Sequence, residues 1–350
     1  MKKIIQILAV LVSVITLPVH SQTYLTQVKP AGKSWGYANQ KGEVIIPAQY
    51  IRCYKFSSEG FAAIYDAKEH QYIFINTKGE KMNTEIKEFK LRDGLGLDVE
   101  GFKSGRALIK QGVKWGYFDT NGKIAIAAKY EDANDFCDGF AAAKNDGKFV
   151  VLNIKGEEIP VEAESVIEVK DFSEGLAPFK TSYKRLGFIN TSGKVAIQPQ
   201  YESVGYFKNG LAWAKEPGGL LGYINPKGEW VIKPQFAGGR DFDKESGLAR
   251  VKNGERWAYV NKAGELMYVT DAITWGDFSE GLAEGKKGVK KGFYNNKGVW
   301  VIQPQFDATR DFKNGFAAAK MGDKWGMINK EGKWVIQPTF DGIKDMEAIK

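Results

Sequence analysis

Three glutamates occupy the same place in a recurring Ser-Glu-Gly segment: Glu59, Glu174 and Glu280. Paired carboxylates about 5–10 Å apart are the acid and the base or nucleophile of glycoside hydrolysis. Here each glutamate belongs to a separate copy of the segment, and other copies carry Asn or Ser in its place. We therefore interpret the three glutamates as solvated turn residues.

The chain has 350 residues but only two His and two Cys. His20 lies in a segment that we expect to be removed, and His70 alone cannot build a His-rich zinc site or a catalytic triad. Cys53 and Cys137 belong to units with a whole unit between them. That spacing puts them roughly 14 Å apart at normal strand separation, too far for a disulfide. The sequence predicts two free thiols, no enzyme, no metal and no cofactor.

Tryptophan offers the best candidates for binding. Three tryptophans share one register, two residues after a recurring Gly: Trp230, Trp300 and Trp334. A row of indole rings could stack on sugar rings or on an extended peptide. Val44, Ile124 and Val195 hold the same register elsewhere, and strands use aromatic and β-branched residues for packing in any case. We therefore favour a packing role and keep ligand binding as the alternative.

The positioning elements follow from an internal repeat. An Asn or Asp followed three residues later by Gly recurs nine times, at Asn39/Gly42, Asn76/Gly79, Asp119/Gly122, Asn153/Gly156, Asn190/Gly193, Asn225/Gly228, Asn261/Gly264, Asn295/Gly298 and Asn329/Gly332. The spacing averages about 36 residues. Asn or Asp opens a type I turn by bonding its own backbone, and Gly closes the turn in the left-handed conformation. Each pair therefore predicts a β-hairpin turn.

The flanking residues predict strands. An alternating segment such as residues 115–117 (Trp-Gly-Tyr) precedes the turn, and a segment ending in Pro-x-aromatic, such as residues 302–306, follows it. A third motif, Phe-x-x-Gly-apolar-Ala, links the units, as in residues 312–317. Each unit is thus three antiparallel strands, with room for a short fourth, and no substantial helix is expected.

These motifs resemble a known family. The consensus Lys-Trp-Gly-Tyr-Ile-Asn-x-x-Gly-Lys-Trp-Val-Ile-x-Pro-Gln-Phe, followed by Asp-Phe-x-x-Gly-Leu-Ala, is similar to the WG (or KWG) β-repeat of bacterial proteins. The match spans essentially all of residues 22–350. It is strong in units one, three, five, six, eight and nine, whereas units two, four and seven have drifted. The resemblance implies a structural repeat and no catalytic residues.

A three-stranded unit cannot bury both of its faces alone, so neighbouring units must stack. An open, solenoid-like twisted array tolerates any number of repeats. A closed β-propeller usually has four to eight blades of four strands. Nine units of about 36 residues are many for a propeller and short for its blades. We expect an all-β open array, with a β-propeller as the alternative.

The first 21 residues have the pattern of a signal peptide. Lys2 and Lys3 precede an apolar run over residues 4–17, and short residues near Ser21 suit cleavage before Gln22. The run is shorter than the roughly 20 residues that span a bilayer. We expect residues 1–21 to be removed, residues 22–350 to form one repeat domain without a transmembrane span, and the protein to be periplasmic or extracellular.

The charge pattern disfavours nucleic acid as a partner. The net charge of the whole chain is +8, and removal of Lys2 and Lys3 leaves +6. Acidic residues are interspersed throughout, which is typical of a solvated surface. The sequence thus predicts an exported, non-catalytic repeat protein that binds or scaffolds another protein at the cell envelope. The alternative is a carbohydrate- or peptidoglycan-binding module that uses Trp230, Trp300 and Trp334.

Overall fold

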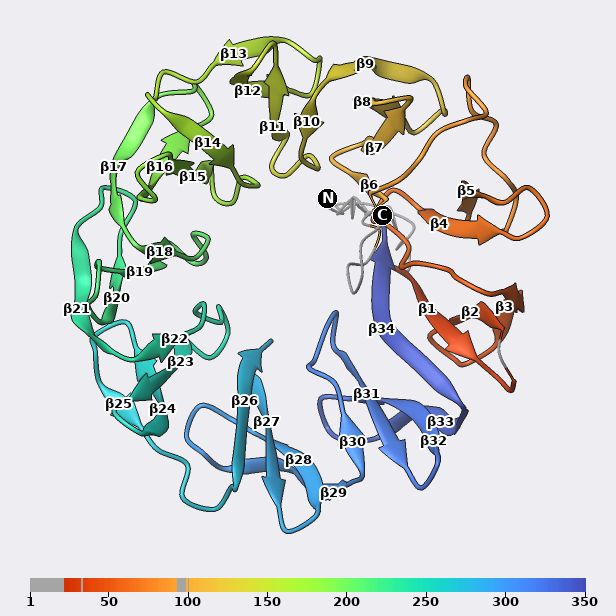
Figure 1. The fold of residues 1–350 in the computed structure, drawn as a ribbon. Coiled ribbons are helices and arrows are strands. Elements are labelled where there is room, and N and C mark those ends of the chain that lie inside the picture. Colours follow the sequence, from red (N-terminus) through yellow and green to blue (C-terminus); the bar gives the residue numbers. More distant parts are fainter. Residues whose placement is uncertain (1–21, 33, 93–98, 100) are drawn as a thin grey trace, which may run out of the picture.

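The computed structural model describes residues 22–32, 34–92, 99 and 101–350, and every regular element within them is a β-strand. The expected signal peptide lies outside the described residues. The strands form nine antiparallel sheets that follow one another around a ring (Figure 1). We call these sheets blades 1 to 9. Eight have four strands, and blade 2 has two. The all-β repeat fold predicted from the sequence is confirmed.

The strands of each blade are given from the inner to the outer side of the ring. Blade 1 contains β34 (Gly342–Ile349), β1 (Thr23–Lys29), β2 (Trp35–Asn39) and β3 (Val44–Tyr50). Blade 2 contains β4 (Phe61–Asp66) and β5 (Gln71–Asn76). Blade 3 contains β6 (Phe102–Lys103), β7 (Arg106–Gln111), β8 (Lys114–Asp119) and β9 (Ile124–Tyr130). Blade 4 contains β10 (Asp132–Ala133), β11 (Phe140–Asn145), β12 (Lys148–Asn153) and β13 (Glu158–Pro160). Blade 5 contains β14 (Val166–Val169), β15 (Leu176–Thr181), β16 (Leu186–Asn190) and β17 (Val195–Tyr201). Blade 6 contains β18 (Ser203–Val204), β19 (Ala212–Lys215), β20 (Leu221–Ile224) and β21 (Trp230–Phe236). Blade 7 contains β22 (Gly238–Gly239), β23 (Leu248–Asn253), β24 (Arg256–Asn261) and β25 (Leu266–Met267). Blade 8 contains β26 (Thr274–Ser279), β27 (Leu282–Lys287), β28 (Lys290–Tyr294) and β29 (Trp300–Phe306). Blade 9 contains β30 (Ala308–Thr309), β31 (Phe316–Met321), β32 (Lys324–Asn329) and β33 (Trp334–Phe340).

The ends of the chain close the ring. The last strand, β34, pairs antiparallel with the first, β1, and so supplies the inner strand of blade 1. Figure 1 shows blade 9 beside blade 1. The expected open array is therefore wrong, because an open array would leave its first and last units without contact. The alternative, a closed ring of blades, describes the structure, since pairing β34 with β1 removes two exposed strand edges.

Packing between the blades shows the same closure. Buried apolar side chains form nine clusters, and each cluster is shared by two neighbouring blades. One of them joins Met327 and Ile336 of blade 9 to Val28 and Met346 of blade 1. Nine units in an open array would have only eight junctions. The core is thus a continuous layer between blades.

Two aromatic positions of the repeat meet across the junctions between blades. Tyr223 of blade 6 packs edge-to-face against Phe242 of blade 7, with ring centroids 4.9 Å apart, and similar pairs lie at five other junctions. The Tyr223 hydroxyl also donates to the Arg240 carbonyl, at 2.8 Å. The Tyr of Trp-Gly-Tyr and the Phe of Asp-Phe-x-x-Gly therefore join one blade to the next.

Every Asn/Asp–Gly pair of the repeat forms a turn. In unit one, the Asn39 side chain accepts backbone N–H bonds from Lys41 and Glu43. In all nine units the glycine N–H donates to the backbone carbonyl of the Asn or Asp three residues earlier. The nine glycines lie in the left-handed region that glycine occupies without strain, with φ of 82° at Gly42, 82° at Gly79, 75° at Gly122, 82° at Gly156, 75° at Gly193, 81° at Gly228, 86° at Gly264, 72° at Gly298 and 76° at Gly332. In the four-stranded blades these Asx turns join the third strand to the outer one.

The glycine beside the recurring tryptophan position allows two strands to approach closely. A Cβ atom on Gly222 would collide with the Ile232 carbonyl oxygen in the adjacent outer strand and lie 2.8 Å from the Pro234 nitrogen. The register of that strand pair shifts at this point because the outer strand is bulged. Pro234 stands in the bulged region, where no ladder N–H is required.

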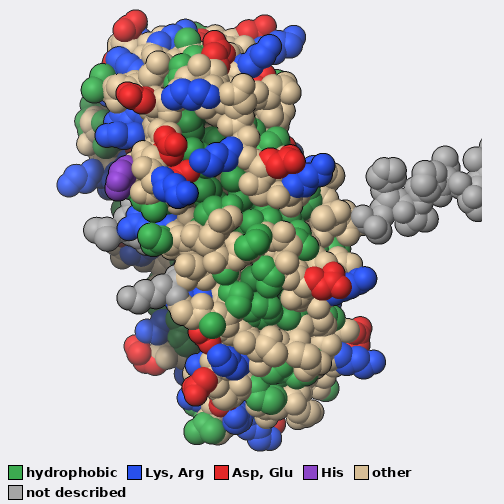
Figure 2. Space-filling model, turned by 90° about the vertical axis from the view of Figure 1, so that its right-hand side faces the viewer, with side chains coloured by type: hydrophobic (Ala, Val, Ile, Leu, Met, Phe, Trp, Pro, Cys, Tyr) green, Lys and Arg blue, Asp and Glu red, His purple; other side chains and the backbone are tan. Residues whose placement is uncertain are grey.

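Successive connections alternate between the two faces of the ring because the strands are antiparallel. One face, the Asx face, carries the Asx turns and the Phe-x-x-Gly turns. The other, the connection face, carries the turns between second and third strands and the links from one blade to the next. Figure 2 shows the rim between these faces, with hydrophobic side chains exposed among Lys, Arg, Asp and Glu. No helix among the described residues is long and apolar enough to cross a membrane.

Candidate functional site

The Ser-Glu-Gly glutamates lie in turns, as predicted, with Glu174 exposed and Glu59 and Glu280 half-buried, and their carboxylates also bind neighbouring blades. The Glu174 carboxylate of blade 5 accepts backbone N–H bonds from Asn209 (2.7 Å) and Gly210 (2.9 Å) of blade 6. Glu280 accepts the equivalent bonds from Asn314 and Gly315. A carboxylate is a strong acceptor for such N–H groups. These side chains therefore link one blade to the next by hydrogen bonds.

A hydrogen-bonded belt of this kind runs around the whole Asx face. Each of the nine junctions has a hydrogen bond between a Phe-x-x-Gly turn and a neighbouring blade. The pairs are Glu59 with Gly105, Ser104 with Gly139, Asp138 with Glu174, Glu174 with Gly210, Asn209 with Phe242, Asp243 with Gly281, Glu280 with Gly315, Asn314 with Met346, and Lys350 with Ser58. Most use a side chain of one turn and the backbone of the next, so different residue types in this position retain the bond.

The glycines of the Asx turns, besides closing the predicted turns, face the preceding unit at most positions. Gly228 is typical, because a Cβ atom on it would lie 3.1 Å from the Ile197 side chain of blade 5. In eight of the nine turns such an atom would meet the preceding unit: Gly42, Gly79, Gly156, Gly228 and Gly332 would meet an isoleucine, Gly298 would meet Val269, and Gly122 and Gly193 would meet a backbone carbonyl oxygen. Only Gly264 has nothing within 4 Å.

The Asx turns therefore have two requirements for glycine at most positions. The left-handed φ is set within the turn, whereas the lack of a side chain allows the turn to pack on the unit before it. None of the nine Asn/Asp–Gly pairs lines the pocket between blades 5 and 8 that is described below. The turn pairs thus contribute to packing between units.

The tryptophan row lies on the rim, at the start of outer strands. Each of Trp230, Trp300 and Trp334 is half-buried and packs edge-to-face against an aromatic ring. The Trp230 and Trp334 rings meet residues of the preceding blade, Tyr201 and Phe306 respectively. The Trp300 indole N–H donates to Asp271 at 3.1 Å. The structure thus gives each ring packing partners, and ligand binding by the three stays a prediction.

His70 and the cysteines are separate from one another. His70 is exposed in the turn after β4, at the connection face. Cys53 and Cys137 are free, as predicted. Burial raises the pKa of the Cys53 thiol and raises that of Cys137 to about 11. Among the described residues, no group of three or more His, Cys, Asp or Glu side chains has the arrangement of a metal site.

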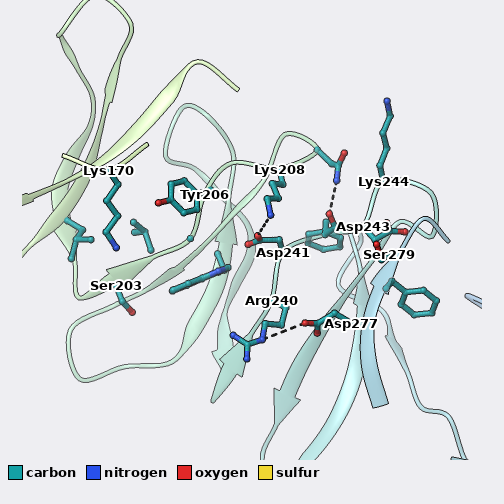
Figure 3. Close-up of a pocket in the computed structure, with 17 residues that line it drawn as sticks. Lys170, Ser203, Tyr206, Lys208, Arg240, Asp241, Asp243, Lys244, Asp277 and Ser279 are labelled. Atoms are coloured by element: carbon teal, nitrogen blue, oxygen red, sulfur yellow. Dashed lines mark hydrogen bonds and ion pairs between the residues drawn. The ribbon is translucent and has the colours of Figure 1, made fainter. Parts of the chain in front are cut away.

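The structure brings together a pocket that the sequence did not indicate. It has a volume of about 730 Å³ and lies against the inner strands β18, β22 and β26 of blades 6 to 8, with Lys170 contributed by blade 5. Figure 3 shows Ser203 and Arg240 toward one end and Asp243, Lys244 and Ser279 toward the other. Gly205 leaves part of the wall without a side chain.

Ion pairs tie the wall of the pocket together. Lys208 of blade 6 contacts Asp241 of blade 7 at 2.9 Å, and Arg240 of blade 7 reaches Asp277 of blade 8 at 3.8 Å (Figure 3). Asp277 is also held by Arg250, at 2.7 Å. Asp241 and Asp277 precede the core Phe of their blades. The basic residue of one blade thus neutralises the aspartate of the next.

Two basic groups and two aromatic rings on the wall remain available to a ligand. Among the described residues, Lys170 and Lys244 have no carboxylate partner, and Lys244 extends away from the other labelled side chains in Figure 3. Tyr206 and Trp213 are half-buried. Burial raises the pKa of the Tyr206 hydroxyl, and the nearby Asp171 carboxylate adds to that shift. The Tyr206 hydroxyl is therefore a neutral donor at physiological pH.

One departure from the repeat consensus could have pointed to this site. The Asp of Asp-Phe-x-x-Gly recurs, and it faces the inner side once the units form a ring. Blade 6 departs from it with Tyr206, and only stacking of blades 5 to 8 brings Lys170, Trp213 and Lys244 beside that residue. The wall offers cations, a neutral hydroxyl and stacking surface, which suit binding. It contains no nucleophile activated by an adjacent base.

The fold and the site define a class: a closed ring of small β-sheet repeats with a pocket on its inner side. The chain belongs to the WG containing repeat family, whose model matches residues 35–65, 115–149, 187–219, 222–257, 292–325 and 325–347. These are the six units in which the motifs are strong. The matches confirm the resemblance found from the residues.

The fold of this chain is similar to that of a solved structure. A eukaryotic initiation factor superposes with a TM-score of 0.59 at 11% identity, covering 93% of this chain and 98% of that one. AztD from Citrobacter koseri gives a TM-score of 0.42 at 11% identity, covering 94% and 98%. BamB from Moraxella catarrhalis gives 0.40 at 10% identity, covering 80% and 91%. No curated protein matches the chain in sequence.

Proposed function

We propose that this protein is a non-catalytic binding module that holds an extended segment of a partner protein in the pocket on the inner side of blades 5 to 8. One observation carries the proposal: Lys170 and Lys244, without carboxylate partners among the described residues, share a pocket with Tyr206 and Trp213. The other recurring residues are engaged in turns, junctions and the belt. An acidic side chain beside an apolar or aromatic one suits this wall.

The cell envelope is the proposed place of action. Support comes from the pattern of residues 1–21, in which a basic start, an apolar run and short residues precede Gln22. Cleavage there would deliver the repeat domain to the periplasm or the exterior, where another envelope protein is the expected partner. N-terminal sequencing of the mature protein from fractionated cells tests this part, and a chain that retains Met1 in the cytoplasm contradicts it.

Affinity capture from envelope extracts tests the pocket. The immobilised protein is compared with a Lys170→Glu/Lys244→Glu variant, which reverses the two unpaired charges. A matched control, Lys297→Glu/Lys333→Glu, makes the same change in exposed lysines of the Asx turns in blades 8 and 9. We expect a partner that is captured by the wild type and the control and lost with the pocket variant. Equal capture by all three would refute the pocket as the binding site.

A second candidate is a carbohydrate- or peptidoglycan-binding module. The half-exposed position of Trp230, Trp300 and Trp334 on the rim supports it. Envelope glycans should then change tryptophan fluorescence, and the response should disappear in Trp300→Ala while circular dichroism stays unchanged. Absence of a response to any glycan of a panel excludes this candidate and leaves the pocket proposal intact.

A further inference from the structure

The five most exposed large apolar side chains among the described residues project from one face of the ring. Their exposed fractions exceed 60%: Ile51 63%, Val113 77%, Tyr183 76%, Ile273 70% and Val289 78%. Val113, Tyr183 and Val289 occupy turns between second and third strands, and Ile51 and Ile273 lie in links between blades. Both kinds of segment belong to the connection face.

Contacts confirm that the turns and the links share this face. Lys287, in the Val289 turn, pairs at 2.8 Å with Asp271, which lies two residues before Ile273. Asp307, in the next link, accepts the Gly322 backbone N–H and pairs with Lys290 at 2.6 Å. The apolar tips therefore stand at one end of the molecule, on blades distributed around the ring.

The three turns that carry the most exposed tips are strongly basic. Residues 110–114, 180–185 and 286–291 read KQGVK, KTSYKR and KKGVKK. They contain nine cationic side chains and no acidic one: Lys110, Lys114, Lys180, Lys184, Arg185, Lys286, Lys287, Lys290 and Lys291. Three of the four lysines around Val289 pair with carboxylates within 3 Å. Among the described residues, Lys180, Lys184 and Arg185 around Tyr183 have no such partner.

The opposite face has a different composition. Its turns carry Val299, which is 58% exposed, and Ile154, which is 41% exposed, and Val44 on the adjoining rim is 43% exposed. Five of its Asx turns place a glutamate directly after the turn glycine: Glu43, Glu80, Glu157, Glu229 and Glu265. The connection face therefore differs in the greater exposure of its apolar tips and in the two to four cations around each of Val113, Tyr183 and Val289.

This composition suits an anionic lipid surface better than a protein. The centres of protein–protein interfaces are depleted in lysine, whereas here Val113, Tyr183 and Val289 each stand among cationic side chains. Surfaces that bind membranes combine separate apolar side chains, which enter the headgroup region, with cations that attract anionic lipids. A flat ring presents several such tips to one plane at once.

We propose that the connection face docks on an anionic lipid bilayer, with Val113, Tyr183 and Val289 inserted among the headgroups and the flanking lysines against the phosphates. The Phe-x-x-Gly belt then faces away from the bilayer. Docking by this face is independent of the pocket on the inner side, so the ring can bind a partner protein while it rests on the membrane.

Vesicle flotation tests the proposal. We expect the protein to bind vesicles of equimolar phosphatidylcholine and phosphatidylglycerol and not phosphatidylcholine alone, and the binding to weaken as salt rises from about 0.1 M to about 0.5 M. A Val113→Ser/Tyr183→Ser/Val289→Ser variant should lose about tenfold in affinity. The matched control Val44→Ser/Ile154→Ser/Val299→Ser, on the Asx face and the adjoining rim, should bind as the wild type does.

The design separates the alternatives. Residues 4–17 are themselves apolar, so all variants keep the same N-terminus, and the set is repeated with chains that begin at Gln22. Circular dichroism and thermal unfolding establish that each variant is folded. The proposal is overturned by equal binding of both vesicle types, by equal losses in the two triple variants, or by vesicle binding only in chains with residues 1–21. It is also overturned if the connection-face variant loses a protein partner but no lipid binding.

Discussion

Thr26 and Met346 are paired residues on the two strands that close the ring, although they come from opposite ends of the chain. Met346 is fully buried and belongs to the apolar cluster between blades 9 and 1. One strand from the C-terminus thus completes both the first sheet and the last junction between blades. Closure makes the stability of every blade depend on this strand.

Met346→Ala should destabilise the protein by about 2–5 kcal/mol, because it removes a buried side chain and leaves a cavity. Met321→Ala is the control, since Met321 is 41% exposed, and should change stability by less than about 0.5 kcal/mol. Urea unfolding measures both.

Scattering should give a radius of gyration near ~20 Å for the wild type and a larger one for a chain that ends at Phe340. An unchanged radius after truncation would argue against closure by β34.

Glu174→Ala should cost about 1 kcal/mol, because it removes two hydrogen bonds to the next blade from a partly solvated carboxylate. Glu255→Ala is the control, since the Glu255 side chain is 97% exposed and only 3.8 Å from Lys252. The control should be close to neutral. Chemical unfolding distinguishes the two, and equal effects would show that the belt contributes nothing specific.

Gly222→Ala should destabilise the protein by more than about 2 kcal/mol, because the new Cβ would collide with the Ile232 carbonyl oxygen. Gly238→Ala is the matched control. A Cβ there meets nothing closer than 3.9 Å, and the backbone is not left-handed. It should be neutral or slightly stabilising, since alanine restricts the unfolded chain. Thermal unfolding of both variants decides whether close approach, not glycine itself, sets the requirement.

Asp307→Asn should lower stability at neutral pH and flatten its fall in acid. The hydrogen bond from Lys290, followed by that from the Gly322 backbone, lowers the pKa of the Asp307 carboxyl. A pKa below the unfolded value of about 3.9 means that the stabilisation is present above about pH 4 and is lost as the pH falls through the folded pKa. Asp323→Asn is the control, because Asp323 is exposed and has no ion pair among the described residues. Melting temperatures at neutral and acidic pH measure the difference.

Cys53 and Cys137 should react slowly with a disulfide reagent at about pH 8 in the folded protein. The thiolate is the reactive form, and burial raises both pKa values, that of Cys137 to about 11. Unfolding should release two reactive thiols per chain, and Cys137→Ser should leave one. Recovery of thiols only after reduction would instead reveal a disulfide.

Local chemistry made much of the fold predictable. Asn39 and Gly42 define their hairpin turn within four residues, because the Asn side chain and a left-handed glycine satisfy that turn by themselves. The same holds in the other eight units. The number of units, the strand order within them and the drift of units two, four and seven could therefore all be predicted from the sequence. The two free cysteines followed from their distance along the repeat.

Contacts between residues far apart in the chain could not be predicted from the sequence. Whether β34 meets β1 depends on the small rotation between blades summed over nine junctions, and no single repeat contains that angle. For the same reason the hydrogen bond from the Gly210 turn of the next blade to the exposed Glu174 carboxylate could not be predicted. The contact that Gly228 makes possible with the Ile197 strand was hidden in the same way. The pocket around Tyr206 also needs neighbouring blades in position.

The sequence by itself determined the unit: its turns, its strands and the residues that each unit must bury, because these depend on a few neighbours along the chain. The tertiary structure alone decided the closed ring, the hydrogen-bonded belt and the surfaces available for binding. Those features arise where one blade packs on the next, and the physical reason is that packing acts between residues far apart in the chain, as between Tyr223 and the blade of Phe242 or between Glu174 and Gly210.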